Sequence, residues 1–250
     1  MAAVDAVFAA VVRANRHLRP RVGNPDEMRS NRLLETLELL RFRVTDPEPS
    51  VPESVHGAVI TALNEEAVAS AALANKGGIN LIDTYEAFGA KMHGAVRQEI
   101  IFANHCTEAG RPQRWLSIPL LLTSHTWENG KNEQSHQDPS MPESMLGELS
   151  HVSRVFYPAD FNTAAAVMAE VYRTHGQIWT IVVPKADVPE LLSPDEARRA
   201  VTDGGIDLEW AGLRRESAEL LLVAVGAYQL EQAVAAARRL GERSIAHASS

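Results

Sequence analysis

Residues 152–183, VSRVFYPADFNTAAAVMAEVYRTHGQIWTIVV, hold two short apolar runs with an alanine-rich stretch between them. The runs 152–156 and 178–183 have the length of strands, whereas residues 162–174 have the composition and length of a helix. A strand, a helix and a second strand in this order are typical of a unit in which the two strands are parallel. The stretch therefore predicts an α/β layer fold.

The same alternation continues on both sides of this unit. Strands are predicted at 58–63, 79–82, 115–122 and 220–225, and helices at about 64–76, 85–105 and 228–240. Two amphipathic helices are expected before them, at 3–18 and 27–42. The order predicts a mostly parallel sheet with helices on both faces.

Composition limits the class of protein. The chain has 250 residues, with 24 Lys and Arg against 32 Asp and Glu, and its net charge is -8. Such a charge disfavours general nucleic-acid binding, although a local cationic pocket for a small anion is compatible with it. The single cysteine, Cys106, can form no internal disulfide, supplies no metal cluster and fits a reducing cytoplasm.

Targeting segments are not expected. The first 22 residues interrupt their apolar side chains with Asp5, Arg13 and Arg16, which is not the layout of a signal peptide. The most apolar later run, 220–225, is far shorter than the roughly 20 residues needed to cross a bilayer. The sequence therefore predicts a cytoplasmic protein with no membrane contact.

A polar stretch at 123–147 interrupts the alternation of strands and helices. It follows a predicted strand, and ligands of open α/β sheets bind at the carboxyl ends of strands. A long irregular segment inside a compact domain is more often functional than not. His125 and His136 lack the spacing of a zinc site, and the chain contains no nucleophile elbow and no glycine-rich phosphate loop. The stretch is the candidate site that pattern alone identifies.

Local explanations are available for other polar residues. Asn64, Glu65 and Glu66 lie where a strand ends and a helix begins, so an Asn N-cap with acids in the first turn explains them. Tyr85 and Phe88 lie on one helical face, which usually indicates core packing.

Several long strings, taken together, resemble one family. They are VGNPDEMRSNRL at 22–33, DTYEAF at 83–88, LTSHTW at 122–127, SHQDP at 135–139, RVFYPADFNT at 154–163, LSPDEA at 192–197 and DLEWA at 207–211. These strings resemble phosphoketolases, which are thiamine-diphosphate enzymes related to transketolase. The resemblance covers nearly the whole chain but only the middle part of a full-length phosphoketolase, the module that binds the aminopyrimidine ring of the cofactor.

The resemblance implies roles for individual residues. Glu65, with Glu66 as the neighbouring alternative, would hydrogen-bond the pyrimidine ring nitrogen, which needs a carboxylate in a dry site. Phe88 would stack on the pyrimidine, Tyr85 would face the substrate, and Glu27 would lie in a subunit contact near the cofactor.

A sugar-phosphate anchor is also implied. By resemblance it consists of Ser30, Asn31, Arg32 and Lys185, beside Tyr85. An arginine fork with a lysine point charge suits a dianion, whereas a set of surface salt bridges is the simpler explanation of the same residues.

The segment before SHQDP departs from the family. Family members have an acid, a His, an Asn, a Gly and an aromatic residue there, whereas this chain has Gly130, Lys131, Asn132, Glu133 and Gln134. Lys131, Asn132 and His136 are the further catalytic candidates. A lysine shuttles protons near neutral pH only if its pKa is lowered, so this departure bears on the dehydration step that separates phosphoketolase from transketolase.

The half of the cofactor site that holds the diphosphate is not expected in this chain. The family binds Mg²⁺ or Ca²⁺ with a Gly-Asp-Gly followed by an Asn, whereas this chain has TDGG at 202–205 and no Asn after Asn162. No metal ligand is therefore expected here. A second subunit is expected to supply the diphosphate module and its metal ligands, with two copies of each chain in the assembly.

Three functions remain open from sequence. The chain could belong to a split enzyme that cleaves a ketose phosphate and transfers two carbons to phosphate, or to one that transfers them to an organic acceptor. It could also be a non-catalytic partner-binding homologue. The expected division is a helical segment and linker at 1–50, where prolines cluster at 47–52, a pyrimidine-binding domain at 51–212 and a truncated extension at 213–250.

Overall fold

The structure is a computed structural model that describes residues 2–25, 27–111, 113–124, 128 and 137–249. The chain forms two compact units. The first, here called the sheet unit, comprises Met1–Phe156 and Met168–Ala186. The second, the C-terminal unit, comprises Tyr157–Val167 and Asp187–Ser250. Each is described by itself.

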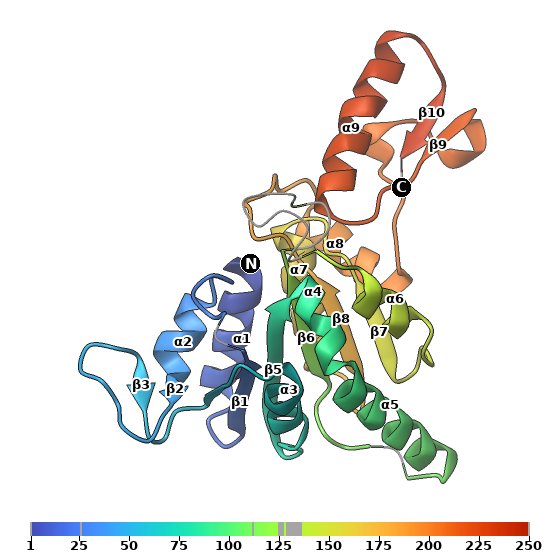
Figure 1. The fold of residues 1–250 in the computed structure, drawn as a ribbon. Coiled ribbons are helices and arrows are strands. Elements are labelled where there is room, and N and C mark those ends of the chain that lie inside the picture. Colours follow the sequence, from blue (N-terminus) through green and yellow to red (C-terminus); the bar gives the residue numbers. More distant parts are fainter. Residues whose placement is uncertain (1, 26, 112, 125–127, 129–136, 250) are drawn as a thin grey trace. The chain divides into compact units, whose positions relative to one another are not determined.

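The sheet unit contains an eight-stranded sheet in which every described strand pair is parallel. Its strands are β1 (Arg19–Asn24), β2 (Phe42–Arg43), β3 (Glu53–Ser54), β4 (Val59–Thr61), β5 (Gly78–Tyr85), β6 (Ile118–Thr123), β7 (Ser153–Phe156) and β8 (Ile178–Val182). They lie in the order β3-β2-β4-β1-β5-β6-β8-β7. Helices flank the sheet on both sides (Figure 1), so the predicted α/β fold is confirmed.

Most helices follow the predicted rhythm with altered bounds, whereas the helix at Ser140–Leu146 lies in the stretch 123–147 that was expected to be irregular. They are α1 (Ala2–Ala14), α2 (Leu34–Leu40), α3 (Glu65–Leu73), α4 (Glu86–Gly89), α5 (His93–Glu108), α6 (Ser140–Leu146) and α7 (Phe161–Val171). The helix expected over 85–105 is divided into α4, a 3-10 turn at Ala90–Met92 and α5. The predicted N-cap is confirmed, because the side-chain oxygen of Asn64 accepts the N–H of Ala67 at 2.9 Å.

Mainly apolar sequences place β5, β6 and β8 in the centre of the core. Leu81, Leu120, Leu121 and Ile181 are fully buried. A strand that is covered on both faces needs no polar alternation, which is why most side chains of these strands are apolar. Burial of each such side chain contributes about 1.5–3 kcal/mol to the transfer term of folding.

One glycine sets how closely α3 approaches the sheet. A Cβ added at Gly23, in β1, would lie 2.2 Å from the carbonyl oxygen of Val68 in α3. The backbone of the helix therefore rests directly on that of the strand. This contact fixes the height of α3, whose first residue is Glu65, above the sheet.

The beginning of the sheet unit differs from expectation. Residues 19–24 form β1, which lies between β4 and β5, whereas no strand was predicted there. The expected helix over 27–42 is reduced to α2, because a series of turns occupies 28–32. The proline-rich stretch is a loop between β2 and β3 of the same sheet, and therefore no linker between domains.

The C-terminal unit has its own small core. It contains α8 (Pro194–Asp203), β9 (Leu220–Leu222), α9 (Ala227–Glu242) and β10 (His247–Ser249), and β9 pairs in parallel with β10. Leu192, Leu208, Leu230 and Val234 pack together in its centre.

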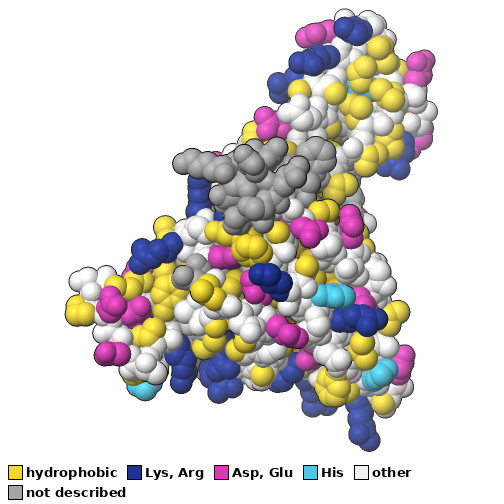
Figure 2. Space-filling model, in the orientation of Figure 1, with side chains coloured by type: hydrophobic (Ala, Val, Ile, Leu, Met, Phe, Trp, Pro, Cys, Tyr) yellow, Lys and Arg dark blue, Asp and Glu magenta, His cyan; other side chains and the backbone are white. Residues whose placement is uncertain are grey.

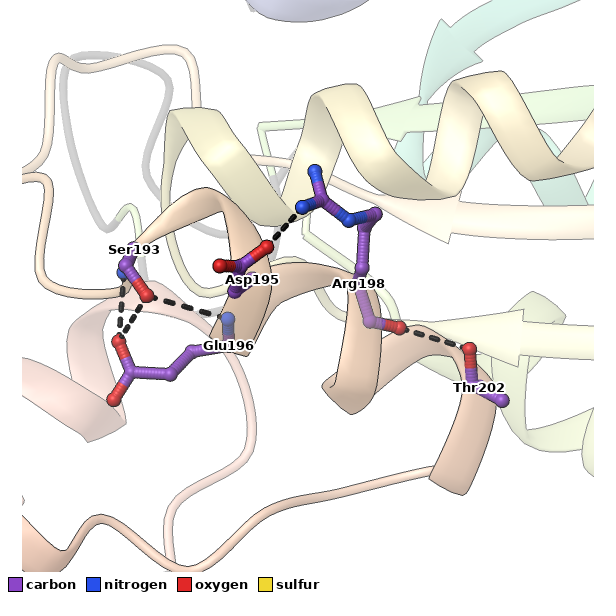
Figure 3. Close-up of polar contacts among 5 residues, drawn as sticks. All are labelled: Ser193, Asp195, Glu196, Arg198 and Thr202. Atoms are coloured by element: carbon purple, nitrogen blue, oxygen red, sulfur yellow. Dashed lines mark hydrogen bonds and ion pairs between the residues drawn. The ribbon is translucent and has the colours of Figure 1, made fainter.

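A capping box begins α8. The hydroxyl of Ser193 accepts the N–H of Glu196, and the Glu196 carboxylate accepts the N–H of Ser193 at 2.8 Å (Figure 3). The helix ends at Gly204, whose φ of 82° is a left-handed conformation that glycine adopts without strain. The TDGG string is thus the end of a helix.

The two units do not follow the three-part division expected from sequence. Residues 1–50 supply β1 inside the main sheet, so they are no separate segment. Residues 187–212 belong with the C-terminal elements, because Leu192 and Leu208 pack with Leu230 and Val234 of α9. Packing rather than sequence order decides these boundaries.

Charge is unevenly distributed over the surface. Figure 2 shows Lys and Arg side chains along the lower margin of the sheet unit, with acidic side chains mixed over the rest of that face. Burial, with the nearby charges of Arg19 and Arg43, lowers the pKa of Arg21 on β1.

Among the described residues, no helix combines the length and the apolar character that a membrane span requires.

Candidate functional site

The predicted site residues gather at the carboxyl ends of the strands. The chain passes from β1 to β2 and β3 at one edge, returns to β4 beside β1, and continues with β5 and β6 on the other side, so the direction of the strand order changes at β1. Ligands of open α/β sheets bind at such a reversal. Asn24, Tyr85 and Thr123 end the strands β1, β5 and β6, and Glu65 begins the helix that follows β4.

Glu65, Phe88 and Lys91 form the first cluster. The Lys91 ammonium lies 2.9 Å from Glu65 Oε1 and 4.5 Å from the centroid of the Phe88 ring. The Glu65 side chain is only 14% exposed, whereas that of Lys91 is 58% exposed. One cationic group thus touches both the carboxylate and the ring, which shows that Glu65 and Phe88 face a common space.

Glu66 is placed differently from its neighbour. It is exposed, and its carboxylate lies over Gly94 of α5, where an added Cβ would be 3.0 Å from Oε1. Of the two acids at the start of α3, Glu65 is the one directed to Phe88.

Ser30, Tyr85 and Lys185 form the second cluster. The Ser30 hydroxyl is hydrogen-bonded to the Tyr85 hydroxyl, and the Lys185 ammonium lies 3.7 Å from the centroid of the Tyr85 ring. The rings of Tyr85 and Phe88 are 5.7 Å apart, so the two clusters adjoin. A hydroxyl pair and a half-buried ammonium are donors suited to an anion.

The pKa of Lys185 reflects this setting. Burial lowers the pKa of its ammonium, while the carboxylates of Glu27, Glu128 and Asp83 oppose the shift. Glu128 also accepts the backbone N–H groups of Lys185 and Ala186, at 2.6 and 2.9 Å. The chain after β8 is thereby held against residue 128.

Glu27 lies beneath the second cluster. It is 6% exposed, and its Oε2 accepts the backbone N–H of Tyr85 at 2.9 Å. Burial raises its pKa to about 7, against the opposing effects of this hydrogen bond and of Lys185. Glu27 is therefore partly protonated near neutral pH.

Asn31 is fully buried in a hydrogen-bond network. Its Nδ2 donates to Asp83 Oδ2 at 2.9 Å, and its Oδ1 accepts the Thr123 hydroxyl at 2.7 Å. Both ends of the amide are therefore occupied within the protein. A direct phosphate contact, as the resemblance implies for Asn31, would require this network to open.

Arg32 ends the same loop with an exposed side chain and a φ of 55°. This left-handed conformation costs a non-glycine residue roughly 1–2 kcal/mol. Backbone strain of this kind is often found at ligand-binding loops.

Lys131, Asn132 and His136 lie outside the described residues, as does His125. Within the described part of the chain, no three His, Cys, Asp or Glu side chains are grouped closely enough to hold a metal ion.

Three residues of the site were not identified from sequence. Lys91 follows Phe88 by three residues, and this helical spacing could have indicated it. Asp83, a charged residue inside the apolar run of β5, and Asn24, at the end of β1, are buried polar groups whose pairing only the folded chain reveals.

Comparison with known proteins identifies the family of the chain. The family described as D-xylulose 5-phosphate/D-fructose 6-phosphate phosphoketolase (XFP) matches residues 2–174. A probable phosphoketolase of Streptomyces avermitilis is 29% identical over 227 residues, which are 88% of this chain and 28% of that protein. One from Mesorhizobium japonicum is 32% identical, over 71% of this chain and 22% of its own length. The chain thus spans less than a third of these curated relatives.

Solved structures share the fold. Transketolase from Leishmania mexicana superposes with a TM-score of 0.75 at 17% identity, over 99% of this chain and 33% of that one. A structure described as a split gene transketolase, inactive beta4 tetramer, has a TM-score of 0.64 at 18% identity and is covered over 68% of its length. The family match extends over more than half of the sequence, and the chain belongs to the D-xylulose 5-phosphate/D-fructose 6-phosphate phosphoketolase family.

Proposed function

We propose that this chain supplies the pyrimidine side of a thiamine-diphosphate site and a sugar-phosphate anchor. In the assembled enzyme it would cleave a ketose phosphate and transfer a two-carbon unit to phosphate or to an organic acceptor. The observation that carries the proposal is the cluster of Glu65, Phe88 and Lys91, in which a carboxylate and an aromatic ring face the same space.

The residues of this cluster suit an aminopyrimidine ring. A poorly exposed carboxylate can form a strong hydrogen bond to a ring nitrogen, and the Phe88 ring offers a stacking face. When bound, thiamine diphosphate would supply the acidic C–H group that two-carbon transfer from a ketose requires. Glu65 would hold a proton against the pyrimidine nitrogen, and Lys91 would have to leave its present place between Glu65 and Phe88.

The second cluster supports the sugar-phosphate anchor. Ser30 and Tyr85 can donate hydroxyl hydrogen bonds to phosphate oxygens, and Lys185 adds a positive charge beside them. Arg32, at the end of the same loop, is placed in the anchor by the family resemblance. Lys131, Asn132 and His136 remain proposed catalytic residues on the same ground.

A second polypeptide is proposed to supply the diphosphate module and the Mg²⁺ or Ca²⁺ ligands, in two copies of each chain. Two observations support this. The chain corresponds to less than a third of its curated relatives, and one structural neighbour carries the description split gene transketolase.

Cofactor titration tests the proposal of a split site. The polypeptide that co-purifies with this chain would be isolated and mixed with it, and thiamine diphosphate with Mg²⁺ would be titrated calorimetrically into the mixture and into each chain alone. Binding should require both chains. Tight binding by this chain alone would refute the split site.

A matched pair of variants tests catalysis. Glu65→Gln should lower acetyl phosphate formation from xylulose 5-phosphate or fructose 6-phosphate by about 10²–10⁴-fold, because it removes an acid–base group. Glu66→Gln, at the exposed neighbour, should leave the rate near that of the unmodified enzyme. If the assembled proteins show no turnover and both variants still bind the partner, the chain is a non-catalytic partner-binding homologue.

A further inference from the structure

The carboxyl group of Asp83 lies fully buried at the end of β5. Its Oδ2 accepts two amide hydrogen bonds, from Asn24 Nδ2 at 2.7 Å and from Asn31 Nδ2 at 2.9 Å. Asn24 Nδ2 also donates to the Asp83 carbonyl oxygen at 3.2 Å. One carboxyl group thus joins the end of β1 to the loop that follows it.

Both asparagines also accept a hydrogen bond from another residue. Asn24 Oδ1 accepts the N–H of Glu27 at 2.5 Å, and Asn31 Oδ1 accepts the Thr123 hydroxyl at 2.7 Å. Each amide is therefore held at both ends. The network ties residues 27–33, here called the anchor loop, to the ends of β1, β5 and β6.

The anchor loop forms tight turns. The N–H groups of Asn31, Arg32 and Leu33 donate to the carbonyls of Glu27, Arg29 and Met28. Arg32 has a left-handed conformation, which needs support from the surrounding structure. Asp83 is one of the groups of the sheet that hold the loop from outside, together with the Thr123 hydroxyl and the Tyr85 N–H.

We propose that Asp83 is a positioning residue that holds the anchor loop in the conformation in which Ser30 and Arg32 reach the ligand. The functional part of this inference rests on the proposed function of the loop. Asp83 itself touches no ligand, because its side chain has no exposed surface.

Burial raises the pKa of Asp83 to about 8, and the charge of nearby Glu27 acts in the same direction, against the hydrogen bonds from the asparagines and the charge of Lys185. Oδ1 has no hydrogen-bond partner among the described residues, so the two side-chain hydrogen bonds, from Asn24 and Asn31, are both made at Oδ2. An amide has the same shape and could accept the same two hydrogen bonds.

The sign of the pH dependence follows. In the unfolded chain the Asp83 carboxyl group releases its proton above the ordinary pKa of 3.8, whereas in the native state it keeps the proton to higher pH. The contribution of this proton to the stability of the native state is therefore full below pH 3.8. It is lost as the pH rises towards about 8. The Asp83→Asn variant cannot titrate at this position, so it should not lose this stability as the pH rises. Between pH 5 and 7, the ratio of the unfolding equilibrium constant of the unmodified chain to that of the variant should therefore increase by up to about tenfold per pH unit.

Three variants of the full chain test the inference. In Asp83→Asn, amide hydrogen exchange in the anchor loop should stay within about threefold of the unmodified chain. In Asp83→Leu, it should rise about tenfold or more while the amides of β6 remain protected, because two buried amide donors lose their acceptor. Asp160→Asn, at a buried aspartate that accepts the N–H groups of Leu191 and Leu192 in the C-terminal unit, should leave the anchor loop unchanged.

Two results would overturn the inference. One is equal pH dependence of unfolding in the unmodified chain and in Asp83→Asn, a comparison that stands even if Asp83→Leu does not fold. The other is anchor-loop exchange that rises in Asp83→Asn, or that stays unchanged in a folded Asp83→Leu. A lack of fructose 6-phosphate binding, measured separately by calorimetry on the assembled enzyme, would refute the proposed phosphate anchor and leave the role of Asp83 in the loop standing.

Discussion

Replacing Gly23 by alanine tests how the sheet positions Glu65. The new Cβ would lie 2.2 Å from the Val68 carbonyl oxygen and 2.8 Å from its carbonyl carbon, both of which are backbone atoms. Ordinary contact needs about 3.4 Å, so α3 must move by about 1 Å away from β1. Overpacking of this kind costs about 1–3 kcal/mol.

The expected result has two parts. The free energy of unfolding should fall by about 2 kcal/mol, which corresponds to a decrease of about 4–8 °C in Tm. Because α3 begins with Glu65, its displacement should also lower activity of the assembled enzyme by about 10²-fold. Urea unfolding followed by circular dichroism measures the first part, and acetyl phosphate formation measures the second.

Gly77→Ala is the matched control. A Cβ at Gly77, in the turn before β5, would meet no atom within 4 Å. This variant should stay within about 0.5 kcal/mol of the unmodified chain. If Gly23→Ala unfolds at the same urea concentration as Gly77→Ala, the close packing of α3 on β1 does not determine the stability of the sheet unit, and the reasoning fails.

Two further substitutions test local interactions. Lys91→Met removes the ammonium that Glu65 binds, so thiamine diphosphate should bind the assembled enzyme about two- to fivefold more tightly by calorimetry. Lys76→Met, which breaks another lysine–glutamate pair beside an aromatic ring, should not change this affinity; equal effects of the two would contradict the prediction. Ser193→Ala should cost about 1 kcal/mol in thermal unfolding at pH 7, because it removes the cap of α8. Hydrogen bonds from the Ser193 side chain and backbone lower the pKa of Glu196, so their contribution is full above its ordinary value of 4.5 and is lost as the pH falls through the lower native value. The difference from the unmodified chain should therefore shrink at pH 3.5; an unchanged difference would argue against the capping box.

Local pattern was enough to predict most elements of the fold. The mainly apolar runs that became β5, β6 and β8 are recognisable because strands buried on both faces need few polar residues. Asn64 was recognised as an N-cap because its partner, the N–H of Ala67, is three residues away. Such signals depend on neighbours in sequence.

Other elements were missed because distant residues stabilise them. The segment RPRVGN at 19–24 has two arginines, a proline and a glycine, which are poor strand formers, and yet it lies in the middle of the sheet as β1. Its backbone groups are satisfied by β4 and β5, and Gly23 is needed for the approach of α3. Tertiary pairing overrides propensity here.

Some residues of the site could also be predicted from sequence, whereas others could not. The family resemblance indicated Glu65, Phe88, Ser30 and Lys185 as site residues, and the structure places them in two adjoining clusters. The contact of Lys91 with Glu65 and Phe88 could not be derived from sequence, because it depends on how α4 and the following turn lie against α3.

The sequence by itself determined the alternation of strands and helices from β4 to α5 and from β7 to β8, the start of α3 and the family. Tertiary structure alone decided that β1 is central, that Asn31 is buried, and that Asp83 and Glu27 have raised pKa values. The physical reason is the range of the interactions: helical periodicity and capping join residues a few positions apart. Burial and the pairing of polar groups depend on residues that are far apart in the sequence and come into contact only in the folded chain.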